Sequence, residues 1–163
     1  MIAWQERPVE VANLLNPAFC GVITQEFVKE YNSQTSTGVP FELVFLVLPI
    51  ILHKKTRDLL PMRSTTMMHV WLQKHPEVRI GFSQRTKELI PFTKESISFL
   101  LVRKLLAVDE YGNFFRTKRR NRKSIADLPI ELTSYIRKTR LVAKWFAQNS
   151  SSSTIYTMWG IRP

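Results

Sequence analysis

Positive charge is concentrated in one short segment of the sequence. Six of the eight residues from 116 to 123 are Lys or Arg, and we call this stretch the cationic segment. Such a run repels itself and should be exposed until phosphates or acidic side chains neutralise it. We predict that it contacts nucleic-acid phosphates, and a plain solvated loop is the alternative. The predicted contacts are Arg116, Lys118, Arg119, Arg120, Arg122 and Lys123, with Arg137, Lys138, Arg140 and Lys144 as secondary ones.

The charge of the whole chain is just as uneven. The formal net charge is +11 at pH 7, but residues 1–62 hold five Lys or Arg against six acids, a balance of −1. Residues 63–163 hold nineteen against seven, a balance of +12. A scattered excess would indicate only a solvated surface, whereas this concentration favours a polyanionic partner. We therefore expect contacts to double-stranded DNA, made to its phosphates without reading bases.

Residues that could perform catalysis are few and scattered. The sequence holds no phosphate-binding glycine loop and no Ser or Cys nucleophile paired with a base. His53, His69 and His75 have no neighbouring ligands in sequence, and none is paired with another at the i, i+4 spacing of zinc-binding helices. Cys20 lies in an apolar run and is predicted to be a core residue. We predict a protein that is not an enzyme and holds neither metal nor cofactor.

The composition is typical of a globular protein of one compact domain or two very small ones, and we predict a single compact domain. The chain has 163 residues and 44% hydrophobic content, which is enough to bury a core. One cysteine excludes an internal disulfide, and no charged region followed by an apolar stretch opens the sequence. The longest apolar run falls short of the about twenty residues that a membrane span needs. We expect a cytoplasmic protein that does not enter a membrane.

That apolar run, residues 39–61, is predicted to form the centre of the fold. Between Phe41 and Leu52 only Glu42 is charged, and the apolar residues point all round a helix, as in a buried helix. Pro49 lacks a backbone donor and would crowd the carbonyl of Phe45. We therefore predict either a kink or a break into two shorter helices.

Further helices are predicted on both sides of this run. Residues 9–27 have helical spacing but are interrupted at Asn16-Pro17, where Asn16 would cap the helix that Pro17 begins. The sequence leaves open whether this interruption is a kink or a full break. The polar residues 32–38 are predicted to form a loop. The helices predicted after the apolar run are 64–75 capped by Ser64, 78–89 ended by Pro91, and 93–105 capped by Thr93.

The pattern then changes to that of a β-hairpin. Residues 105–109 and 113–117 flank a short loop in which Gly112 can adopt positive φ. Three helices followed by a hairpin is the order of elements in a winged-helix domain, whose third helix enters the major groove of DNA. The same order occurs in domains that never bind DNA, and winged helices also serve as protein-docking modules.

A long helix from about 127 to 148 is predicted next, with an apolar face inward and Lys and Arg outward. A flexible link at 150–153 and a short helix at 154–159, ended by Gly160, would close the chain. The predicted fold is mainly α, with a winged-helix-like unit and a C-terminal helix. Its three parts are an apolar helical part (1–62), the winged-helix-like part (63–125) and the C-terminal helices (126–163).

Several short strings in the sequence carry a family resemblance. They are Trp4, Arg7-Pro8-Val9-Glu10, Ala12-Asn13-Leu14 and Asn16-Pro17-Ala18-Phe19 at the start, then Phe45-Leu46-Val47-Leu48-Pro49, Leu52-His53, Thr56-Arg57, Trp71-Leu72, Phe82 and Arg85, and finally Gly160-Ile161-Arg162-Pro163. They resemble the middle-component proteins of bacterial three-component ABC-ATPase systems, the group that includes Lamassu-type anti-phage defence. The cationic segment matches no motif of that family.

The resemblance implies a small non-catalytic subunit in anti-phage or anti-plasmid defence. Its partners would be an SMC- or Rad50-like ABC ATPase and an effector such as a nuclease. It would dock on one of them and help to sense or hold invading DNA, and no catalytic residue carries over. The distribution of charge agrees with this role, because an apolar, nearly neutral half suits protein docking and a basic half suits phosphate.

Two other functions stay open. A stand-alone winged-helix transcription regulator would be a homodimer on a palindromic site, and its helix 93–105 would have to read bases. For that task Ser96, Ser98, Arg103 and Lys104 are a thin set. A docking protein that uses its cations on an acidic partner would bind DNA weakly even at low salt, while its protein complex would be salt-sensitive.

Overall fold

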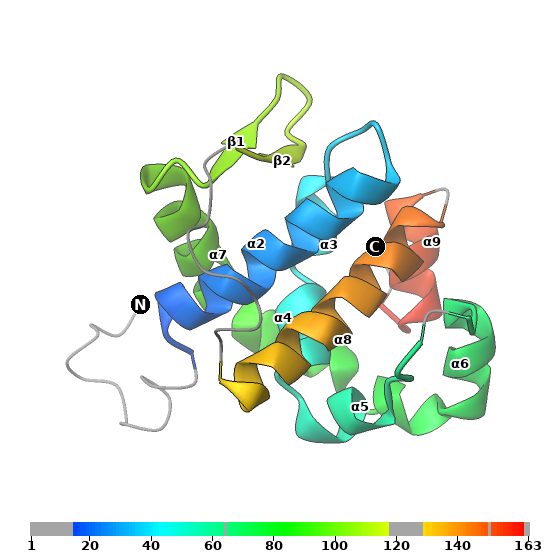
Figure 1. The fold of residues 1–163 in the computed structure, drawn as a ribbon. Coiled ribbons are helices and arrows are strands. Elements are labelled where there is room, and N and C mark those ends of the chain that lie inside the picture. The colour runs from blue at the N-terminus through cyan, green and yellow to red at the C-terminus, as the bar shows by residue number, and fades with distance from the viewer. Residues whose placement is uncertain (1–14, 64, 118–128, 150, 162–163) are drawn as a thin grey trace.

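Three long helices form the body of the fold, namely α2 (Pro17–Gln34), α7 (Phe82–Val102) and α8 (Ile130–Ala147). The computed structural model describes residues 15–63, 65–117, 129–149 and 151–161 (Figure 1). Helix α2 packs along both α7 and α8. The first helical part predicted from the sequence, before Asn16, lies outside the described residues.

Helix α2 begins as predicted but continues further than predicted. The side chain of Asn16 accepts a hydrogen bond from the backbone N–H of Ala18 at 2.7 Å, and Pro17 occupies the first helical position. The helix then runs to Gln34, so the loop predicted over residues 32–38 is shorter than expected. Tertiary contacts extend it, because Tyr31 is buried and Asn32 bonds to a distant strand.

The apolar run at 39–61 forms the centre of the fold as a series of short helices. Phe45 and Leu46 separate α3 (Phe41–Val44) from α4 (Val47–Ile51), and α4 contacts α2, α7 and α8. The helix is interrupted here because Pro49 cannot donate a hydrogen bond to the carbonyl of Phe45. Helix α5 (Lys54–Leu59) follows. The fully buried side chains of the run include Val44, Leu46, Val47, Leu48, Ile50 and Ile51.

The prediction that Pro91 ends a helix is wrong. Helix α6 (Met68–Lys74) and a 3-10 turn (Pro76–Arg79) come first, and α7 then passes through Pro91 without interruption. Pro91 has no N–H to donate to the carbonyl of Lys87, four residues earlier, and both residues are exposed on the solvent side of the helix. The opposite face of α7 carries the buried Phe82, Ile97 and Leu100, and the helix packs against α2 and α4. Burial of this face offsets the roughly 3 kcal/mol that an interior proline costs. Ser64, the predicted cap of the preceding helix, lies outside the described residues, and that helix begins at Met68.

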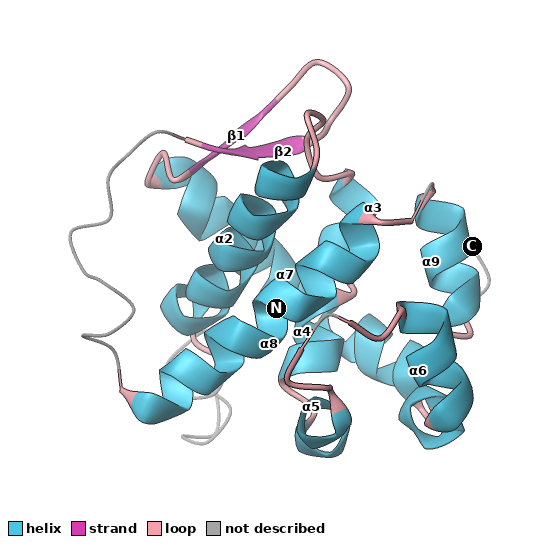
Figure 2. Ribbon diagram, turned by 45° about the vertical axis from the view of Figure 1, so that its right-hand side comes forward, coloured by secondary structure: helices cyan, strands magenta, loops and turns pink. Residues whose placement is uncertain are grey.

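The predicted hairpin is confirmed. Strands β1 (Leu106–Val108) and β2 (Phe114–Arg116) are antiparallel, with Ala107 opposite Phe115, and Gly112 has a φ of 81° in the connecting turn. The hairpin lies at one end of the helical body (Figure 2). Two backbone hydrogen bonds between Val39 and Phe114, at 2.9 and 2.8 Å, attach it to the chain just before α3.

The C-terminal helices are also close to the prediction. Helix α8 ends at Ala147, and α9 (Ser152–Met158) begins earlier than predicted because Ser151 caps it by accepting from the N–H of Thr154. Gly160 follows α9 with a φ of 75°. Trp71, Phe82, Trp145 and Trp159 form an aromatic cluster that joins α6, α7, α8 and α9.

The fold is therefore mainly helical, with one small antiparallel hairpin and a C-terminal helix, as predicted. No helix within the described ranges is long and apolar enough to cross a membrane. The winged-helix assignment and the division into three parts stay predictions.

Candidate functional site

Arg116 is the one predicted primary phosphate contact that the structure places. It is the last residue of β2, and its backbone N–H donates to the side-chain oxygen of Asn32 in α2 at 3.0 Å. Its Nε is buried and has no hydrogen-bond partner among the described residues. The chain therefore enters the cationic segment from a strand end that is tied to α2. The other primary contacts, Lys118, Arg119, Arg120, Arg122 and Lys123, lie outside the described residues.

Two of the secondary candidates are paired with acids of α2. Arg140 lies 2.6 Å through Nε and 2.5 Å through Nη2 from the Oε1 atom of Glu26. The Nζ atom of Lys144 lies 3.8 Å from the Oε1 atom of Glu30. The side chain of Glu26 is only 12% exposed, so its pair with Arg140 is partly shielded from water. A phosphate would have to compete with these carboxylates for both cations.

The other two secondary candidates differ from each other. The ammonium group of Lys138 donates to the carbonyl of Leu60, next to the end of α5. Burial lowers the pKa of Lys138, although Asp58 acts in the opposite direction. Arg137 is exposed on the outer face of α8. Of the four secondary candidates, Arg137 is therefore the most accessible to a ligand.

Arg57 and Arg85, the two arginines of the family strings that the structure describes, have structural partners. Arg57 donates to the carbonyl of Ile51 at 2.8 Å, and its guanidinium lies 4.4 Å from the ring centre of Tyr135. Arg85 donates to the carbonyls of Ile80 and Val78 at 2.7 and 3.0 Å. These side chains donate to carbonyls at the ends of short helices, which would otherwise have no hydrogen-bond partner within the helix.

His53 and Cys20 also have structural surroundings. The Nδ1 atom of His53 accepts from the N–H of Thr56 at 3.3 Å and so caps α5. Burial, followed by the charges of Arg85, Lys55 and Arg57, lowers its pKa. Cys20 is buried as predicted, and burial raises its pKa to about 12. Neither group is placed as a nucleophile or a general base, and the described residues contain no cluster of three or more potential metal ligands.

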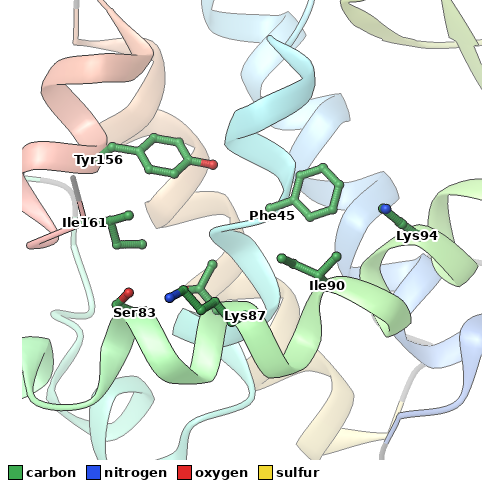
Figure 3. Close-up of a pocket in the computed structure, with 8 residues that line it drawn as sticks. Phe45, Ser83, Lys87, Ile90, Lys94, Tyr156 and Ile161 are labelled. Carbon is green, nitrogen blue, oxygen red and sulfur yellow. The ribbon is translucent and has the colours of Figure 1, made fainter. Parts of the chain in front are cut away.

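A pocket that the sequence did not predict lies beside α7 (Figure 3). Its volume is about 340 Å³, and its lining is mostly apolar. Helix α7 contributes Ser83, Thr86, Lys87, Ile90 and Lys94. Phe45 comes from the turn between α3 and α4, Tyr156 from α9, and Ile161 from the residues after α9.

The hydroxyl of Tyr156 is held in this pocket by the main chain. It donates to the carbonyl of Glu42 at 2.7 Å. Burial, followed by the charge of Glu42, raises the pKa of Tyr156 to about 12. The spacing of Ser83, Lys87, Ile90 and Lys94 marks one helix face, but this signal is hidden when Pro91 is expected to end the helix.

A family model described as ABC-three component (ABC-3C) system Middle Component 3 matches residues 4–163 of the chain. The match includes all of the strings described above. Comparisons with curated proteins and with solved structures give no match.

Proposed function

The chain belongs to the Middle Component 3 family of ABC-three component systems, and from this membership we propose how it acts within such a system. It is an accessory component of an ABC-3C defence system. In our proposal it has no catalytic role, docks on an SMC- or Rad50-like ATPase or on a nuclease-like effector, and contacts DNA phosphates. A place in a Lamassu-type system is part of the same proposal.

One contrast in the distribution of charge carries the DNA part of the proposal. On α8, Arg140 and Lys144 face Glu26 and Glu30, so their charge is largely balanced within the protein. The cationic segment holds six Lys or Arg and no acid. An excess of positive charge that the neighbouring sequence does not balance favours phosphate binding through release of counterions.

The regulator alternative has less support. The C-terminal half of α7 would have to enter the major groove, but Ser96 is buried there, with its Oγ 3.4 Å from the hydroxyl of Thr24 in α2. Arg103 and Lys104 follow the end of the helix. Few side chains of α7 are left to read base edges.

Salt-dependent binding tests the DNA contact. Arg119, Arg120 and Arg122 are changed to Gln in one variant. Three exposed cations on α5 and α6, Lys54, Lys55 and Lys74, are changed to Gln in a control of equal charge. If each arginine contacts one phosphate, the slope of log K against log salt for a duplex falls by roughly 3 units in the first variant. Equal slopes in the variant and the control would refute the assignment.

Co-purification tests the accessory role. The tagged chain is expressed together with the other components of its system, and the complex is separated by size exclusion and identified by mass. We expect a stoichiometric complex with the ATPase or the effector. Recovery of the chain alone as a dimer would refute this role and favour the regulator.

A further inference from the structure

The pocket beside α7 combines apolar walls with two lysines. Ser83, Lys87, Ile90 and Lys94 follow one another at spacings of four, three and four residues, so they lie on one face of the helix. Lys87 and Lys94 are two turns apart, roughly 10 Å along the helix axis. In the close-up of the pocket, Ile90 lies between Lys87 and Lys94 along α7, and the ring of Phe45 lies across from Ile90 (Figure 3).

Neither lysine is neutralised by the part of the protein that the structure describes. Both are exposed, and the ion pairs of the described residues involve neither of them. No acidic side chain lines the pocket. The α7 side of the rim is therefore positive and the walls are apolar, a combination that suits an apolar group with negative charge beside it.

The apolar surface continues outside the pocket. Phe41 is 47% exposed, and its ring centre lies 5.0 Å from that of Phe45 and 5.8 Å from that of Phe114 in the hairpin. Phe45, Ile90 and Ile161 in the pocket are themselves only half-buried. A group bound here would stay exposed to solvent on one side. This suits a side chain of a longer polypeptide better than a small molecule, which needs an enclosed site.

We propose that this pocket docks a segment of a partner protein in which an apolar side chain is flanked by acidic residues. The apolar side chain would lie against Phe45, Ile90 and Ile161, and the acidic residues would pair with Lys87 and Lys94. Duplex DNA is a poorer occupant because its phosphates gain nothing from the apolar walls. The inference rests on the proposed accessory role and names the chemistry of the segment that is recognised.

The test uses the full chain co-expressed with the other components of its system. The variant Lys87→Glu with Lys94→Glu reverses the charge of the rim, and Lys54→Glu with Lys55→Glu reverses two exposed charges on α5 as a matched control. All four side chains are exposed, so unfolding temperatures close to wild type are expected for both variants. We expect the rim variant to recover at least tenfold less of the ATPase or effector, while the control recovers as much as wild type.

A photo-crosslinking amino acid at Ser83 identifies what occupies the pocket. We expect crosslinks to an apolar residue of the partner that has Asp or Glu within a few positions, and loss of these crosslinks in the rim variant. The inference alone would be overturned if the rim variant recovered as much of the partner as wild type, or if the rim variant and the control lost it equally. Crosslinks to DNA, to a second copy of this chain or to a segment without acids would also overturn it. Failure of the wild-type chain to recover any component would overturn the accessory role and the inference together.

Discussion

Replacing Gly38 with Ala tests how the hairpin is held against the helical body. A Cβ atom at this position would lie 2.4 Å from Cε2 of Phe115 and 2.7 Å from Cβ of Asn113. Carbon atoms normally approach to about 3.5 Å, so the hairpin would have to retreat by roughly 1 Å. Phe115 can swing its ring aside, but the Cβ of Asn113 moves only with the main chain.

The main chain of the hairpin is held firmly at this point. Asp109 accepts from the N–H of Asn113 at 2.8 Å, and Val39 and Phe114 exchange two hydrogen bonds. Forced overpacking of this kind costs about 1–3 kcal/mol. A Gly-to-Ala change in an unhindered loop would instead stabilise the protein by about 0.4–1 kcal/mol through the unfolded chain. The expected net loss in the free energy of unfolding is about 1–2 kcal/mol.

Urea denaturation followed by circular dichroism measures this loss. Gly21→Ala is the control, because its Cβ would meet its nearest neighbours at 3.4 Å, a distance that small side-chain shifts relieve. Alanine is also favoured over glycine by about 1 kcal/mol inside a helix, so this variant should be neutral or more stable. A Gly38→Ala protein at least as stable as wild type would refute the view that close contact with the hairpin selects glycine at position 38.

Two further predictions concern charge. Glu26→Gln should lower the free energy of unfolding by about 1–2 kcal/mol because Arg140 on α8 loses its charged partner on α2. The control is Lys29→Gln, because the side chain of Lys29 is more exposed. Equal stability of the two variants in urea would contradict this reasoning. Asp109 is expected to make stability depend on acid pH. Burial would raise the pKa of its carboxyl, but hydrogen bonds from Asn113 and Tyr111 outweigh this and hold the pKa below the ordinary 3.8. The stability that ionised Asp109 contributes is therefore complete above the ordinary pKa of 3.8 and is lost as the pH falls through the lower pKa of the folded state. The unfolding temperature of Asp109→Asn should therefore fall less steeply than that of wild type below about pH 4. Parallel curves would exclude this contribution.

Local signals predicted much of the fold. Asn16 and Pro17 mark the start of α2 through interactions that span two residues, and Gly112 marks the hairpin turn through its own φ. The apolar run at 39–61 predicted the centre of the fold because burial is the only environment that suits so many apolar side chains. The passage of α7 through Pro91 was missed, since it depends on packing against α2 and α4, which the local sequence does not contain. With it the pocket was missed, because its lining comes from α7, the turn before α4 and the end of the chain.

The sequence by itself determined the amount of charge, its concentration at residues 116–123 and the family to which the strings at both ends point. Only the tertiary structure decided which cations are balanced. Arg140 and Glu26 are 114 residues apart, and nothing local distinguishes Arg140 from the exposed Arg137. Periodicity and capping act over a few residues, whereas an ion pair between helices forms only after packing brings α2 and α8 together.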